Sequence, residues 1–162
     1  MELQAFEPQV LVLADALRRR GWRIATAESC TGGLIAAACT QLAGSSDWFE
    51  RGFVTYSNAA KIELLGVDST LIEAQGAVSD AVARAMVQGA LRRAPVDLAL
   101  AVTGIAGPGG AVPGKPVGTV WLAWGTMADV RTELLQLGGD RDAVRSASVH
   151  AALRRLTEAA QP

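Results

Sequence analysis

Residues 25–34 read ATAESCTGGL, and the predicted fold is organised around this stretch. Ile24–Ala27 is typical of the end of a buried strand, and Gly33 opens an apolar run that is typical of a helix. Residues 29–31 are therefore expected on the turn between the strand and the helix. The first turn of a helix presents unpaired backbone N–H groups, so this turn suits a nucleophile placed beside an anion or an oxyanion.

Length and composition indicate one domain that spans residues 1–162. Half of the residues are hydrophobic and 19% are charged, but no apolar run approaches the roughly 20 residues that a membrane-spanning helix needs. The N-terminal residues MELQAFEP lack the pattern of a secretory signal, so we expect a cytoplasmic protein. A formal charge of -1 gives no general electrostatic reason to bind nucleic acid.

Hydrophobic periodicity, helix caps and glycine stops predict six helices and five strands. The predicted helices are Pro8–Arg20, Gly33–Leu42, Ala59–Leu65, Asp68–Ala74, Asp80–Arg93 and Arg141–Ala159. Gly21 is the predicted stop of the first helix, and Ser79 is the predicted cap of the fifth. The predicted strands are Trp22–Ala27, Gly52–Tyr56, Leu98–Val102, Val117–Trp124 and Val130–Leu137. Helices and strands alternate early and a hairpin comes late, which predicts an α/β fold with a mixed, mostly parallel sheet between helical layers.

Metal-ligating residues are scarce. Cys30 and Cys39 are nine positions apart, which matches neither a redox nor a zinc CxxC pattern, and His150 is the one histidine. We therefore expect neither a metal site nor an organic cofactor.

Three polar stretches are predicted to share one cleft: Glu28–Gly33, Tyr56–Lys61 and Thr103–Gly110. Two of them follow strand ends, and ligands of open α/β sheets bind at the carboxyl ends of strands. The glycine-rich third stretch lacks the lysine and the spacing of a phosphate-binding loop, so its sequence fits a plain turn equally well.

Ser29 is a candidate nucleophile, and a serine hydroxyl needs a base. His150 lies in the middle of the last helix, where a packed histidine is the expected role, so Lys61 is the alternative base. With Asn58 as helix cap, Lys61 takes the third position of a short helix, and the positive helix end disfavours its ammonium form. This effect is too small by itself to neutralise a lysine, so burial must supply the rest.

Two further side chains bear on this chemistry. Tyr56 is the only tyrosine, and its hydroxyl can relay or orient the proton between serine and lysine. Cys30 is the alternative nucleophile, because a helix N-terminus lowers a thiol pKa, although a cysteine packed beneath the turn is the simpler interpretation. Arg141 and Arg145, one helical turn apart, either grip a phosphate together or are solvated.

Several motifs together resemble one family. They are TAESCTGGL (26–34), AGSSDWFERGFVTYSNAAK (43–61), GAVS (76–79), TGIAGP (103–108), KPVGTVW (115–121) and GDRDAVR (139–145). In this order they resemble the nicotinamide mononucleotide amidohydrolase family, also known as the C-terminal domain of CinA proteins, from about Val10 to Leu156. Family members often carry an additional N-terminal domain, and this chain resembles the stand-alone form.

The resemblance implies a compact α/β/α fold, a homodimer or larger homo-oligomer, and hydrolysis of the small molecule nicotinamide mononucleotide to nicotinate mononucleotide and ammonia. It also implies Ser29 as nucleophile and Lys61 as its base, with Tyr56 assisting. A different reading is a non-catalytic module that binds nucleotides or proteins, and a third is hydrolysis of another small amide or ester by the same residues.

Substrate-binding roles are assigned to two groups of residues. Backbone N–H groups near Thr31 and Gly32 are expected to receive the oxyanion, and Cys30 and Gly33 complete this turn against the substrate. Thr103, Gly104 and Arg141 are expected to contact the ribose and the phosphate.

Overall fold

The structure is a computed structural model that describes residues 1–162. The helices are α1 (Glu7–Arg20), α2 (Leu34–Thr40), α3 (Asn58–Leu65), α4 (Ser69–Gln75), α5 (Asp80–Arg93) and α6 (Arg141–Ala160), with short 3-10 helices at Leu3–Phe6 and Ser45–Asp47. The strands are β1 (Ile24–Glu28), β2 (Phe49–Val54), β3 (Leu98–Gly104), β4 (Thr119–Gly125) and β5 (Val130–Gln136). No helix is both long enough and apolar enough to cross a membrane.

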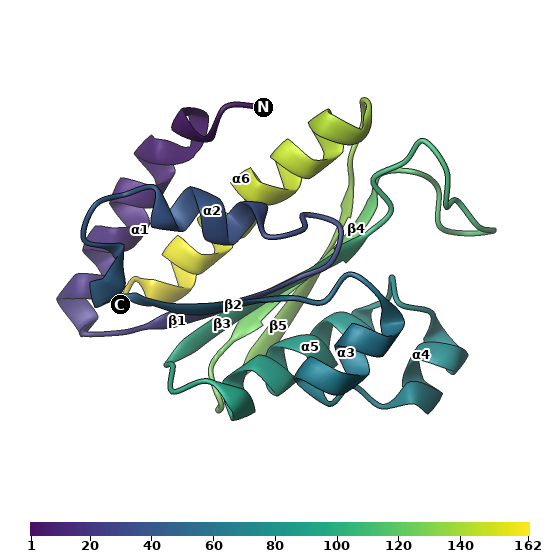
Figure 1. The fold of residues 1–162 in the computed structure, drawn as a ribbon, viewed down its shortest axis with the longest axis horizontal. Helices are drawn as coiled ribbons and strands as arrows, with labels where there is room; N and C mark the ends of the chain where they lie inside the picture. The colour runs from purple at the N-terminus through teal and green to yellow at the C-terminus, as the bar shows by residue number, and fades with distance from the viewer.

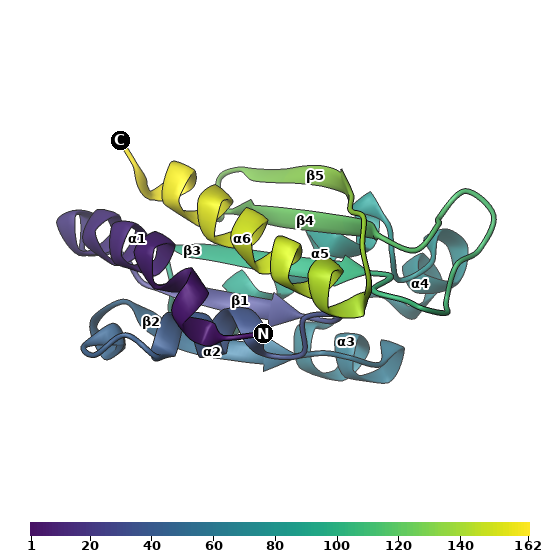
Figure 2. The ribbon, with the colours of Figure 1, turned by 90° about the horizontal axis from the view of Figure 1, so that it is seen from above.

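The five strands form one sheet in the order β2-β1-β3-β4-β5 (Figure 2). β1 pairs in parallel with β2 and β3, β4 is antiparallel to β3, and β5 is antiparallel to β4. Four of the five strands therefore point the same way. Helices α1, α2 and α6 cover one face and α3, α4 and α5 cover the other, which confirms the predicted three-layer α/β/α fold (Figure 1).

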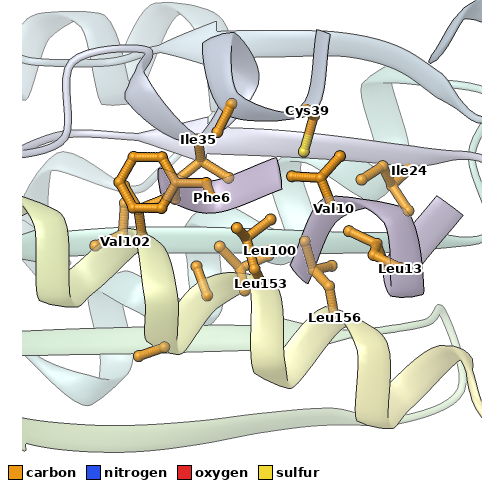
Figure 3. Packing of buried hydrophobic residues seen from close by; sticks show 14 of the residues in the cluster. Phe6, Val10, Leu13, Ile24, Ile35, Cys39, Leu100, Val102, Leu153 and Leu156 are labelled. Atoms are coloured by element: carbon orange, nitrogen blue, oxygen red, sulfur yellow. The ribbon is translucent and has the colours of Figure 1, made fainter. Parts of the chain in front are cut away.

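The central strand β3 divides the core by side-chain size. Leu98, Leu100 and Val102 point into the larger core under α1, α2 and α6, whereas Ala99 and Ala101 point into the smaller core under α5. Successive side chains of a strand alternate between faces, so this apolar run serves both cores at once. Figure 3 shows Leu100 and Val102 packed with side chains from α1, α2 and α6.

Close packing on the second face depends on a glycine in α5. A Cβ atom at Gly89 would lie 2.1 Å from the carbonyl oxygen of Leu65 at the end of α3. Only glycine permits this approach of helix to backbone. The contact fixes α3, which carries Lys61, against α5.

The first predicted helix and its stop are confirmed. Gly21 ends α1 with φ +63° and donates its N–H to the carbonyls of Leu17 and Arg18. The N–H of Trp22 also donates to Leu17, at 3.0 Å, so Trp22 belongs to the helix end and not to the first strand as predicted.

The parallel strands bring three chain segments to one edge of the sheet. Glu28, the last residue of β1, pairs with Val54 of β2 and with Val102 of β3. The residues that follow these three positions therefore lie side by side. This edge holds Ser29, the segment that leads to Lys61, and Thr103.

Candidate active site

The turn after β1 is fixed to both neighbouring strands. The N–H of Ser29 donates to the carbonyl of Val102 at 3.0 Å, and the N–H of Thr55 donates to the carbonyl of Glu28 at 2.8 Å. The chain then reverses in a tight turn, in which the N–H of Gly32 donates to the carbonyl of Ser29 at 3.0 Å. Ser29 is thereby held at the carboxyl edge of the sheet.

The carboxylate of Glu28 closes this turn from within. It is fully buried, and it accepts hydrogen bonds from the Thr31 hydroxyl at 2.7 Å and from the N–H groups of Ile35 and Ala36 at 2.9 Å each. The N–H groups in the first turn of a helix have no partner within the helix, so the Glu28 carboxylate satisfies two of them in α2. Its negative charge also stabilises the N-terminal end of the helix. Glu28 therefore has a structural role, namely to attach the turn to the start of α2.

Arg145 of α6 holds the same turn from the other side. Its Nε atom donates to the carbonyl of Cys30 at 3.2 Å, and one of its terminal nitrogens donates to the carbonyl of Thr31 at 3.1 Å. None of the ion pairs in the protein includes Arg145. The guanidinium thus directs its charge at two peptide carbonyls.

Lys61 of α3 reaches Ser29 from the face of the sheet opposite to α6 and Arg145 (Figure 1). Its side chain is only 1% exposed, and its Nζ atom lies 3.1 Å from Oγ of Ser29. Nζ also donates to the carbonyls of Thr55 at 2.8 Å and Tyr56 at 3.3 Å. Burial lowers the pKa of the Lys61 ammonium below that of an ordinary lysine, because removal from water disfavours the charged form.

The cap of α3 differs from the prediction. Ser57 is the N-cap, since its hydroxyl accepts from the N–H of Ala60, and Asn58 is the first helical residue. Lys61 is therefore the fourth residue of the helix rather than the third. Its depressed pKa comes chiefly from burial and not from the helix end.

Tyr56 is oriented differently from Lys61. The Tyr56 residue is 60% exposed, and its hydroxyl oxygen accepts a hydrogen bond from Arg141 at 3.1 Å. Arg141 also donates to the carbonyl of Gly107 at 2.9 Å. The contact between Tyr56 and Lys61 is made by the tyrosine backbone, so a hydroxyl relay between serine and lysine is not the arrangement of this structure.

The three polar stretches do share one cleft, as predicted. A pocket of about 210 Å³ opens above Ser29 and Lys61. Its lining residues are Ser29, Cys30, Tyr56, Asn58, Lys61, Ala77, Val78, Thr103, Gly104, Ala106 and Arg141. Ser29 and Lys61 therefore both border a space that a small molecule can enter.

Thr103 and Gly104 form the part of this wall that β3 contributes. The Thr103 hydroxyl donates to the carbonyl of Ala77 at 2.9 Å, which ties the wall to the segment before α5. A Cβ atom at Gly104 would lie 2.6 Å from Cγ2 of Val120, so glycine is required here for the packing of β3 on β4.

Cys30 is the last residue of the turn that lines the pocket. Thr31, Gly32 and Gly33 do not line it, and the N–H of Gly32, expected to receive an oxyanion, instead donates to Ser29. Gly33 has φ +96° and begins α2 as its N-cap. The N–H groups of Cys30, Thr31 and Gly33 donate to no other residue, so they are the free donors of the turn.

The surroundings of Cys30 and His150 indicate packing roles for both side chains. Burial raises the pKa of the Cys30 thiol to about 11, so the thiolate that a nucleophile requires is disfavoured. His150 packs on Phe6 with ring centroids 4.7 Å apart and contacts the side chain of Gln9 through Nδ1. Neither residue competes with the pair of Ser29 and Lys61. No group of three or more His, Cys, Asp and Glu side chains is placed to hold a metal ion.

Comparison with known proteins gives the family of this chain. The family model described as CinA C-terminal domain matches residues 7–160. The chain belongs to this family. One relative of this chain is a protein from Pseudomonas putida named nicotinamide-nucleotide amidohydrolase PncC. The two sequences are 53% identical over 90% of this chain and 91% of that protein.

Other relatives differ in length. A CinA-like protein from Syntrophobacter fumaroxidans is 51% identical over 90% of this chain, which spans only 34% of that protein. Among solved structures, the competence/damage inducible protein CihA from Agrobacterium tumefaciens superposes with a TM-score of 0.92 at 44% identity and covers 96% of both chains. The CinA C-terminal domain fold is thus found both in relatives of similar length and within longer proteins.

The sequence did not predict the roles of some residues of this pocket. Asn58 lines the pocket, although the sequence predicts it as a helix cap. Ser57 and Asn58 are adjacent and both of the cap type, and only one of them can cap the helix, so their pairing indicates that the other is free for another role. The sequence leaves Arg141 and Arg145 as either a joint phosphate grip or two solvated side chains, whereas the structure directs Arg145 to the turn and Arg141 to the pocket. Hydrogen bonds to backbone carbonyls leave no pattern in a sequence.

Proposed function

We propose that this protein hydrolyses the carboxamide of nicotinamide mononucleotide to nicotinate mononucleotide and ammonia, with Ser29 as nucleophile and Lys61 as base. The observation that carries the proposal is the distance of 3.1 Å between Nζ of Lys61 and Oγ of Ser29 in a buried setting. The names of the amidohydrolase relatives, at about half identity over most of the chain, support the substrate.

The surroundings of Lys61 suit a base that works uncharged. Its two other contacts are carbonyl oxygens, Thr55 O and Tyr56 O, which accept hydrogen bonds and carry no formal charge. A neutral amine has two N–H bonds and one lone pair. It can donate both N–H bonds to these carbonyls and turn its lone pair to the Ser29 hydroxyl.

Acylation follows from this geometry. Lys61 takes the proton of Ser29, and Oγ attacks the carboxamide carbon, whose oxygen becomes an oxyanion. Free backbone N–H groups stabilise such an oxyanion, a contribution typically worth about 3 kcal/mol. The Lys61 ammonium then gives its proton to the carboxamide nitrogen, the C–N bond breaks, and ammonia leaves a nicotinoyl ester on Ser29.

Deacylation repeats these steps with water. Neutral Lys61 takes a proton from water, the resulting hydroxide attacks the ester carbon, and the C–O bond to Ser29 breaks as the proton returns to Oγ. The reaction balances as amide plus water to carboxylic acid plus ammonia. It needs no oxidant or reductant.

Recognition of the rest of the substrate is assigned to the pocket wall. Arg141 supplies the positive charge for the phosphate, and the Tyr56 hydroxyl, which already accepts a hydrogen bond from Arg141, orients that side chain. Thr103 and Gly104 provide the surface for the ribose. In this account Tyr56 acts in binding rather than in proton transfer.

The experiment is an ammonia assay with purified protein and a panel of nicotinamide mononucleotide, nicotinamide riboside, nicotinamide and an unrelated small amide. Release from the mononucleotide, lost in Ser29→Ala, supports the proposal. Binding of the mononucleotide without ammonia release would instead favour a non-catalytic nucleotide-binding module. Faster turnover of the unrelated amide than of the mononucleotide would contradict the proposed substrate but not the proposed mechanism.

A further inference from the structure

We infer that Arg145 is a positioning residue that holds the Cys30–Thr31 peptide so that its free N–H group points at the oxyanion, and this inference rests on the proposed function. The starting observation is that Arg145 binds the carbonyls of Cys30 and Thr31 and no carboxylate. An arginine with five donors and a fixed planar shape is well suited to hold two neighbouring carbonyls at once.

Because a peptide group is planar, holding its carbonyl also fixes the direction of its N–H group. In a trans peptide the C=O of one residue and the N–H of the next point in opposite directions. The carbonyl of Cys30 faces Arg145 on α6, so the N–H of Thr31 in the same peptide points away from α6. Helix α6 and helix α3 cover opposite faces of the sheet (Figure 1). The N–H of Thr31 therefore points toward the face of α3, from which Lys61 contacts Ser29.

The same turn leaves this donor free. The N–H of Gly32 is already bonded to the carbonyl of Ser29, whereas the N–H groups of Cys30 and Thr31 have no partner in another residue. Free donors that follow the nucleophile in the chain have the right place for an oxyanion formed on the carbon that Oγ attacks.

The charge of Arg145 adds to its geometry. A cation at a carbonyl oxygen draws electron density from the peptide and makes the attached N–H a stronger donor, in the way that hydrogen bonds in a chain strengthen one another. Glu28 holds the other side of the turn through the Thr31 hydroxyl at 2.7 Å. With Arg145 removed, the turn keeps this attachment and the carbonyl of Thr31 keeps the N–H of Leu34 at 3.1 Å, but the carbonyl of Cys30 loses its donor.

The role is tested with Arg145→Ala and Arg145→Lys, and with Arg154→Ala as matched control. Arg154 is an exposed arginine of the same helix and makes no hydrogen bond or ion pair. Two readouts are measured: kcat and KM for ammonia release from nicotinamide mononucleotide, and the rate at which p-nitrophenyl acetate acylates Ser29. Thermal unfolding of each variant reports the fold.

We expect Arg145→Ala to lower kcat and the acylation rate by about tenfold to a hundredfold, a smaller loss than deletion of a whole oxyanion donor, with KM changed less than about twofold. Arg145→Lys recovers part of the loss, because an ammonium can hold one carbonyl, and added guanidinium ion recovers part of the activity of Arg145→Ala. Arg154→Ala matches the wild type.

Unchanged kcat and acylation in Arg145→Ala would overturn the inference, as would a rise in KM alone, which would make Arg145 a substrate-binding residue. A loss that follows only the melting temperature would make its role structural. Wild-type protein that is acylated at Ser29 but releases no ammonia would reject the proposed substrate while the acylation rates still test Arg145. Absence of acylation in the wild type would reject both.

Discussion

Nζ of Lys61 lies 3.1 Å from Oγ of Ser29, although 32 residues separate them in the chain. The two side chains meet because β1 and β2 are parallel neighbours, so the turn after β1 and the segment that leads from β2 into α3 leave the sheet at the same edge. Lys61 then turns back under the sheet edge, where 99% of its surface is buried. This burial lowers the pKa of the Lys61 ammonium and so favours the uncharged amine beside a serine.

Replacement of Lys61 should remove most of the activity. Lys61→Met keeps the length of the side chain and deletes the base, so we expect kcat/KM to fall by at least about a hundredfold and its rise with pH to disappear. In the wild type the rise should follow the loss of the Lys61 proton at a pH below the ordinary lysine range, since burial lowers this pKa. Lys115→Met is the control, because Lys115 is the only other lysine and lies outside the pocket.

The same pKa shift predicts how stability depends on pH. In the folded protein Lys61 has a lowered pKa, so between that value and the ordinary lysine pKa the unfolded chain binds more protons than the folded one. The free energy of unfolding of the wild type should therefore rise with pH across this window. Below it the full cost of the buried lysine persists.

Denaturant unfolding of the wild type and of Lys61→Met across this pH range is the measurement. The stability advantage of Lys61→Met should be largest at neutral pH and should shrink as the pH approaches the ordinary lysine value. A difference that stays constant throughout would mean that Lys61 titrates alike in the folded and unfolded states.

Removal of the Cys30 thiol should leave the chemistry intact. Burial raises the pKa of Cys30 to about 11, so at neutral pH it is a thiol that packs beside the pocket. Cys30→Ala should retain kcat within about fivefold, as measured by ammonia release. A loss as large as that of Ser29→Ala would transfer the nucleophile from Ser29 to Cys30.

Glu28 should be essential to the turn. Glu28→Gln places an amide NH₂ group opposite N–H donors of α2, and an unsatisfied buried donor costs about 1–3 kcal/mol. The variant should unfold at lower denaturant concentration and lose activity together with the order of the turn. Unchanged stability would contradict the assignment of the Glu28 carboxylate as a structural clamp.

The features that were predictable from the sequence follow local rules. The apolar run of β3, the glycine stop at Gly21 and the cap at Ser79 of α5 each carry a one-dimensional pattern, and all three are present in the structure. The meeting of Ser29, Lys61 and Thr103 at one edge followed from strand direction and chain order.

Features that depend on three-dimensional contacts were not predictable. The choice of Ser57 over Asn58 as cap, the exposed hydroxyl of Tyr56 and the direction of Arg145 are set by packing between elements distant in the chain. The single domain at residues 1–162, the cytoplasmic location and a homodimer or larger assembly stay predictions.

The most direct measurement of the central claim uses the fact that the chain contains only two lysines, Lys61 and Lys115. In protein labelled with ¹⁵N-lysine, an NMR titration gives two Nζ signals, and Lys115→Arg assigns them. We predict that Nζ of Lys61 loses its proton at a pH well below that of Lys115, and that Ser29→Ala alters its chemical shift. Two Nζ signals that titrate together in the ordinary lysine range would contradict an uncharged base beside Ser29.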